Sequence, residues 1–229
     1  MSREAPRGIH TPDSEGSASI IRTARTTLLG GLGIVLGVIY PLVGSIDPAW
    51  PRIPGGQLVS WMVFAVALGI LAFGVPGESG IVGDSGVGRV ALFVFGIHEL
   101  VLGIAGAVTP MSTDPAAAVA AAGTPAAIFG GWVFLSVGIL GLVAAVVAAV
   151  AIVRAGILHG PARWALLPVP VAWAVGLALL FVPVQEVALV GVRFSTAVFP
   201  LLALVGAAYA LHGRWPAIRA RLRILNEKW

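Results

Sequence analysis

Six runs of apolar residues, each long enough to cross a lipid bilayer, constrain the fold of this chain more than any other feature. They lie at residues 27–46, 57–75, 89–109, 128–153, 164–182 and 187–211. A helix rises 1.5 Å per residue, so about 20 apolar residues span about 30 Å of hydrocarbon. A backbone segment in lipid must satisfy its own hydrogen bonds, which favours helices. The sequence therefore predicts an all-α bundle of six transmembrane helices.

Composition places the chain in a membrane. Hydrophobic residues make up 58% of the sequence and charged residues only 10%, which is too little polar surface for a soluble monomer. The 30 glycines and 16 prolines are tolerated in membrane helices, where neighbouring helices satisfy the loosened backbone. There is no cysteine, so disulfides and thiolate metal or redox sites are excluded.

Two polar segments flank the six apolar runs. Residues 1–26 are mixed in charge and rich in Pro, Ser and Thr, which predicts a disordered tail. Residues 27–212 form the expected transmembrane domain, and residues 213–229 form a basic amphipathic segment whose helix is expected to start at Pro216. Its expected role is contact with anionic lipid or simply an anchor that fixes topology. The basic side chains of this segment are Arg219, Arg221, Arg223 and Lys228.

The basic residues also predict orientation. With a cytoplasmic N-terminus, twelve of the 14 Lys and Arg residues fall on the cytoplasmic side, and only Arg52 and Arg193 fall outside. This asymmetry predicts a multi-pass protein of a bacterial inner membrane with both termini in the cytoplasm. It also makes a nucleic-acid partner unnecessary to explain the net charge of +4. Three tryptophans are expected at the outer membrane interface, namely Trp50, Trp61 and Trp132.

Two ionisable residues, His98 and Glu99, lie in the middle of the third run. A charge at bilayer depth is costly, so such residues are functional or paired. Glu99 shares a helix face with Gly96 and Gly103, and small residues line helix contacts in membranes. We therefore expect Glu99 to face the bundle interior. His98 is turned about 100° away and is expected to reach a second neighbouring helix.

Helix 6 supplies the expected partners of Glu99. Arg193 is within side-chain reach of the depth of Glu99, or it extends to the outer surface near Glu186. Pro200 is expected to kink this helix at Thr196. Two interpretations stay open, a polar cavity or a buried pair that only fixes packing. The expected polar site comprises Glu99, His98, Arg193, Thr196 and Tyr40.

No cofactor is indicated by the sequence. Retinal needs an intramembrane lysine, and the only lysine is Lys228. A haem held by two histidines needs them at matched depth, which the sequence does not provide. Zinc would find few ligands besides His98. Ser136 is the one nucleophile at a depth similar to that of His98, but it stands in no recognised motif. The glycine-rich stretch 83–90 lacks the Lys of a phosphate-binding loop and predicts a turn instead.

A family resemblance supports the same architecture. Thr113-Asp114-Pro115 after the third run and Gly191-x-Arg193 in the sixth, together with six helices, resemble a bacterial and archaeal six-helix membrane protein family of unknown function. Because the activity of that family is unknown, the resemblance implies architecture only.

Three functions follow from these observations, in decreasing order of support. The first is a transport-like protein with a buried polar site between helices 3 and 6 for a small solute, ion, proton or lipid head group. The second is a structural or accessory membrane subunit without its own activity. The third is an intramembrane lipid-modifying enzyme, for which the sequence gives no strong motif. A homo-oligomer or a membrane partner stays open.

Overall fold

The computed structural model describes residues 23–47, 53, 55–108 and 124–226, and these residues form helices and connections without a strand. Six stretches of them are long and apolar enough to cross a membrane: Ala24–Ile46, Gly56–Phe73, Gly86–Ala105, Ile128–Ala155, Pro161–Leu180 and Gln185–Arg214. The predicted all-α, six-helix membrane class is therefore confirmed. The helices are α2 (Ala24–Ile46), α3 (Gly56–Phe73), α4 (Gly86–Val108), α6 (Pro125–Ala155), α7 (Pro161–Trp164), α8 (Pro168–Leu180), α9 (Gln185–Thr196) and α10 (Val198–Asn226).

Prolines divide the last two spans. The fifth consists of the short α7 and then α8, which begins at Pro168, a residue suited to the first helical position. The sixth is interrupted at Ala197 between α9 and α10, one turn before Pro200. This break lies where the kink was expected, since Pro200 has no N–H to bond the carbonyl of Thr196.

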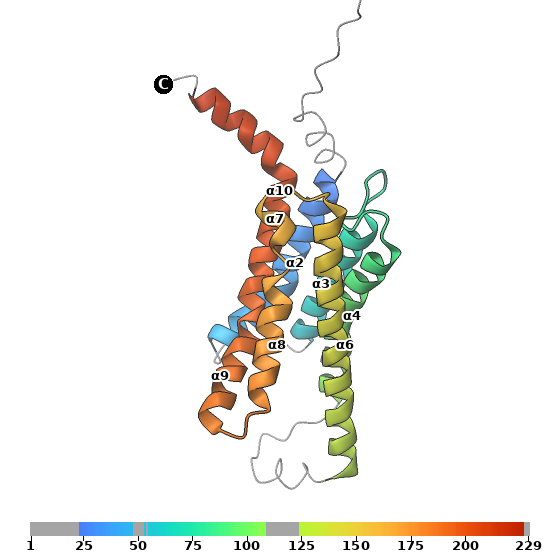
Figure 1. Ribbon diagram of the computed structural model, residues 1–229, viewed down its shortest axis with the longest axis vertical. Coiled ribbons are helices and arrows are strands. Elements are labelled where there is room, and N and C mark those ends of the chain that lie inside the picture. Colours follow the sequence, from blue (N-terminus) through green and yellow to red (C-terminus); the bar gives the residue numbers. More distant parts are fainter. Residues whose placement is uncertain (1–22, 48–52, 54, 109–123, 227–229) are drawn as a thin grey trace, which may run out of the picture.

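The two ends of the chain differ from expectation. Helix α2 begins at Ala24, three residues before the expected start of its apolar run. No new helix starts at Pro216, since α10 runs continuously to Asn226 and projects beyond the bundle (Figure 1). Residues 1–22 of the expected tail, the Thr113–Pro115 motif and Lys228 lie outside the described residues.

The helices pack in a consistent order. Helix α2 lies between α10 and α3, α4 follows α3, and α6 follows α4. Helices α8 and α9 form a hairpin that contacts α6 and α10 much less extensively (Figure 1). The start of α2 and the outward projection of α10 lie at the same end of the bundle (Figure 1), as an even number of spans requires.

Glycines allow α2 to approach both of its neighbours closely. A Cβ atom added at Gly206 of α10 would lie 2.6 Å from the carbonyl oxygen of Gly31, and one at Gly37 would lie 2.7 Å from the Cα of Phe64 on α3. Such distances are shorter than van der Waals contact, so only glycine fits at these positions. Close backbone approach replaces hydrophobic association as a source of packing energy in lipid.

The first turn of α2 is capped by a residue far away in the sequence. The carboxylate of Glu78, in the α3–α4 connection, accepts the backbone N–H of Arg25 at 3.1 Å and that of Thr26 at 2.7 Å. The hydroxyl of Thr26 in turn accepts the N–H of Val75 at 3.1 Å. The negative charge also complements the positive end of the helix dipole. This connection is a packed element and not only a turn, since Ile81 and Val82 are buried.

Trp61, which was expected at the outer membrane interface, is buried inside the bundle. Its indole is 2% exposed and lies in the core, edge-on to Phe64 at 5.9 Å and tilted against Phe199 at 6.1 Å between ring centroids. The space for it comes from Gly103, where a Cβ would lie 2.9 Å from Cδ1 of the indole. A bulky aromatic side chain gains more packing inside the bundle than at its surface.

We predict that Gly31→Ala destabilises the bundle, because the new methyl group would overlap the backbone of Gly206 and Ala210 and force α2 and α10 apart. The expected loss is about 1–3 kcal/mol, the usual cost of overpacking. Thermal unfolding in detergent measures it. Gly44→Ala on the same helix is the matched control, because a Cβ there meets nothing within 4 Å. Equal stability of the two variants would contradict the prediction.

Removal of the distant cap should also lower stability. Glu78→Ala leaves the N–H groups of Arg25 and Thr26 without their acceptor, and loss of a helix cap costs about 1 kcal/mol. We expect a lower midpoint of thermal unfolding and faster amide hydrogen exchange in the first turn of α2. Glu186→Ala, which removes an exposed carboxylate from the first turn of α9, controls for the loss of a charge. Unchanged exchange at Arg25 and Thr26 would argue against the cap.

Candidate functional site in the bundle interior

The glycine face of α4 packs against α3. A Cβ at Gly96 would lie 3.1 Å from Cβ of Leu68 and 3.2 Å from Cα of Ala65, and Gly103 lies under Trp61. The expectation that this face is a helix contact is thereby confirmed. Glu99 follows Gly96 by three residues and is partly buried, next to the side of α4 where Leu92 and Phe95 are buried.

The imidazole of His98 is enclosed by three helices. It stacks on Phe95 of its own helix, with 5.4 Å between ring centroids, and lies 5.0 Å from the indole of Trp173 on α8. On its third side is Gly141 of α6, where an added Cβ would come within 2.8 Å of Nε2. As expected from its angular position, His98 therefore reaches beyond the α3–α4 contact, to both α6 and α8.

Hydrogen bonding fixes the tautomer of His98. Its Nδ1 contacts the carbonyl oxygen of Phe95, and because a carbonyl only accepts, Nδ1 must carry the proton. In a neutral ring the lone pair is then on Nε2, which lies 3.3 Å from Oε1 of Glu99. A lone pair and a carboxylate oxygen repel each other at this distance. The contact is therefore favourable only when one of the two groups carries an additional proton.

The contact is an electrostatic pair and not a well-aligned hydrogen bond. Although Nε2 and Oε1 are within ion-pair distance, Nε2 has no partner in hydrogen-bond geometry among the described residues. The side chain of His98 is 1% exposed, whereas that of Glu99 is 20% exposed. The carboxyl group is thus the accessible member of the pair, and the imidazole is the enclosed member.

The other expected site residues lie elsewhere. Arg193 and Thr196 are exposed on α9, where the Thr196 hydroxyl donates to the carbonyl of Arg193 at 2.9 Å. Tyr40 donates to the carbonyl of Ile53 in the α2–α3 connection at 3.4 Å. Within the described part of the chain, the ion pairs are Arg89–Asp84 and His98–Glu99. Glu99 and Arg193 therefore form no pair in this structure.

Two residues of the His98 environment are not evident from sequence alone. Trp173 is a single deep tryptophan, and Gly141 belongs to a small-residue run on α6 that the sequence marks only as a packing face. The buried Ala145 and Ala148 agree with that packing role, while Gly138 has no neighbour within 4 Å of an added Cβ. The contact between His98 and Gly141 could be predicted only if α4 and α6 were already known to be neighbours.

A second group of buried polar atoms lies near the end of the bundle that carries α7. Tyr209 Oη and His212 Nε2 on α10 are buried without a hydrogen-bond partner among the described residues. The ring of His212 stacks on that of His159, with 6.3 Å between centroids and 9° between planes. Tyr209 and His212 are three residues apart in the sequence and therefore share one face of α10.

The remaining candidates do not form sites. Ser136 is exposed on α6 and forms no hydrogen bond with His98. In the glycine-rich connection, the guanidinium of Arg89 donates to the carbonyl of Gly83 at 2.7 and 3.0 Å. These two bonds tie Arg89 back to the preceding loop, in agreement with the turn predicted for residues 83–90.

Comparisons with protein-family models, with curated proteins and with solved structures found no match.

Gly141→Ala should disturb the site specifically. Its methyl group would overlap the His98 ring, with an expected cost of about 1–3 kcal/mol in stability. Gly138→Ala, one turn away with open space around it, should not lower stability, because alanine is also the better helix former.

A double-mutant cycle separates this contact from a general loss of packing. In a His98→Ala background the space for the methyl group is available, so Gly141→Ala should then cost little, and the coupling should be positive. Thermal unfolding in detergent is the measurement. Additive costs of the two substitutions would show that Gly141 and His98 do not meet.

Proposed function

We propose that this protein binds and releases a proton at the Glu99–His98 pair, in support of the passage of a small solute or ion through the bundle. The observation that carries the proposal is the 3.3 Å approach of His98 Nε2 to Glu99 Oε1, with Nδ1 already committed to the carbonyl of Phe95. One additional proton on either group turns this contact from repulsive to attractive. Ionisable pairs at bilayer depth are typical of proton-linked membrane proteins.

The two side chains take different parts in proton exchange. Glu99, one-fifth exposed, accepts the proton from outside the pair and returns it there. His98 holds the charge inside, where the faces of Phe95 and Trp173 present negative potential to an imidazolium. When the proton leaves, the carboxylate and the neutral imidazole repel, and this repulsion is relieved by movement of Glu99 or by uptake of another cation.

The proposal also covers location and orientation. Six spans with basic residues concentrated in the segments on one side support a cytoplasmic membrane with both termini in the cytoplasm. With this orientation the exposed Arg193 lies near the outer surface, the alternative that the sequence left open. Arg193 and Glu99 form no ion pair among the described residues, so we assign Arg193 no part in the proton site.

Proton flux in liposomes tests the proposal. The purified chain is reconstituted with an internal pH indicator, and an imposed pH gradient with a potassium diffusion potential drives proton entry. We expect the wild type to dissipate the gradient, and Glu99→Gln to slow this by about 100-fold, the scale of loss when a positioned proton-transfer group is removed. His98→Gln should also slow proton entry, because a neutral amide cannot hold the proton.

The matched control is Glu186→Gln, which removes an exposed carboxylate from α9 and should leave flux unchanged. All variants are first shown to elute from size exclusion and unfold as the wild type does. Equal flux in wild type, Glu99→Gln and empty liposomes would overturn the proposal. Together with a stoichiometric partner in native membrane, that result would favour the accessory-subunit hypothesis.

A further inference from the structure

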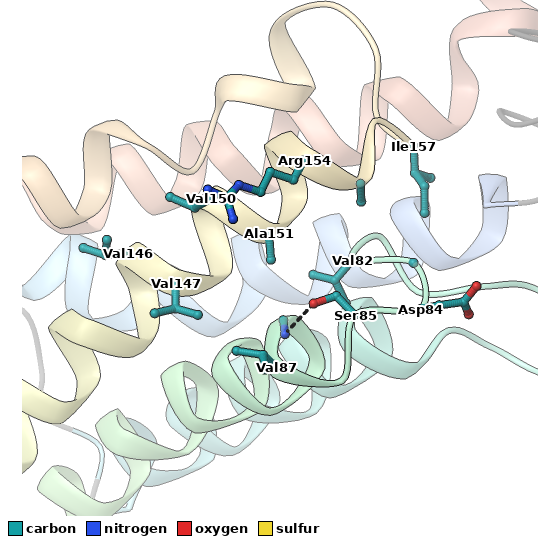
Figure 2. A pocket seen from close by; sticks show the side chains of 13 residues that line it. Val82, Asp84, Ser85, Val87, Val146, Val147, Val150, Ala151, Arg154 and Ile157 are labelled. Carbon is teal, nitrogen blue, oxygen red and sulfur yellow. Dashed lines mark hydrogen bonds between the residues drawn. The ribbon is translucent and has the colours of Figure 1, made fainter.

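A groove with a volume of about 810 Å³ lies between the start of α4 and the last turns of α6 (Figure 2). Its walls are apolar along α6, with Val146 and Val150, and along the first turn of α4, with Val87. Its polar lining residues are Asp84 and Ser85, just before α4, and Arg154, whose side chain extends toward Val150 (Figure 2). The groove is therefore amphipathic, and it is separate from the Glu99–His98 pair.

Three apolar residues of the groove are exposed on stretches that can span a membrane. Val87, Val146 and Val150 are 71%, 45% and 37% exposed, and all three belong to stretches apolar enough to span a bilayer. Arg154 is the penultimate residue of α6. Val146 precedes it by eight residues and so lies roughly 12 Å deeper along the helix axis. The groove thus extends from the polar boundary of the bilayer into its hydrocarbon.

The charge of the polar lining is positive. The carboxylate of Asp84 lies 3.3 Å from the guanidinium of Arg89, which offsets its charge. The Ser85 hydroxyl is occupied as acceptor of the Gly88 N–H at 3.0 Å. The side chain of Arg154 is exposed and forms no hydrogen bond or ion pair with any residue that the structure describes. Its guanidinium is therefore available to an anionic group from outside the chain.

We propose that this groove binds one phospholipid from the leaflet at the end of the bundle where α2 begins, with an acyl chain along the valines and the phosphodiester on Arg154. The surrounding phase at this depth is lipid, so an acyl chain covers the apolar wall without the cost of exposing it to water. Arginine matches the geometry of phosphate oxygens with two parallel N–H donors. An anionic head group adds attraction to the net positive lining.

The inference is independent of the expected lipid contact of the C-terminal segment. That contact rests on Arg219, Arg221 and Arg223 beyond the bundle, whereas this groove belongs to α4 and α6. It is also independent of proton binding, since no residue of the Glu99–His98 pair lines it.

Photolabelling tests the site. The full chain is reconstituted in phosphatidylcholine vesicles that contain phosphatidylglycerol with a diazirine on one acyl chain, and the adducts are mapped by mass spectrometry. We expect adducts concentrated in residues 82–88 and 146–157. Excess unlabelled phosphatidylglycerol should remove them and inorganic phosphate should not, which distinguishes a lipid from a free anion.

Two pairs of variants make the test specific. Val150→Trp fills the groove, and its control Val143→Trp changes an exposed valine of the same helix outside it. Arg154→Gln removes the guanidinium, and its control Arg214→Gln removes an exposed arginine of α10. Each test variant should lower groove labelling by about tenfold, as expected when one charge-assisted contact or the space for a chain is lost, and each control should leave it unchanged. Adducts spread evenly over all apolar faces, or equal losses in test and control variants, would overturn the proposal.

Discussion

The structure depends on close approach of helix backbones, because lipid offers helices no gain from burying apolar side chains against each other. Helix α2 shows this most clearly, with Gly31 against Gly206 of α10 and Gly37 against the backbone of Phe64 on α3. Glycine at these crossings removes the spacing that a side chain would impose. The neighbouring helices then bring their larger residues, such as Trp61 and Phe64, together in one core.

The same rule explains how a histidine fits in the middle of the bundle. The imidazole of His98 needs lateral space, and Gly141 on α6 supplies it, while Phe95 and Trp173 close both faces of the ring. Its partner Glu99 is adjacent in sequence, so no distant residue is required to hold the pair. The polar site is thus compact and local, and its enclosure depends on the helices around it.

Sequence reasoning succeeded where the bilayer itself sets the rule. Span length follows from hydrocarbon thickness, the break before Pro200 follows from its missing N–H, and the glycine face of α4 follows from helix periodicity. It failed where a position in the membrane plane was needed. For Arg193 the sequence fixes depth along the membrane normal but not position in the membrane plane, so it could not show that Arg193 and Glu99 stay apart. For Trp61, a position near a helix end fits both the interface and the core. The Glu78 cap was beyond prediction, because it lies 53 residues from Arg25.

That distant cap has a consequence for the order in which the protein is made. The first turn of α2 is synthesised before residue 78, since Arg25 and Thr26 precede Glu78 by 53 and 52 residues. Because Glu78 follows α3 in the chain, the cap can form only once α3 and the start of the α3–α4 connection have been synthesised. Chains are made from the N-terminus onwards, so the first span gains its cap only after the second span is complete. The cap therefore joins α2, α3 and the start of the α3–α4 connection in one hydrogen-bonded unit.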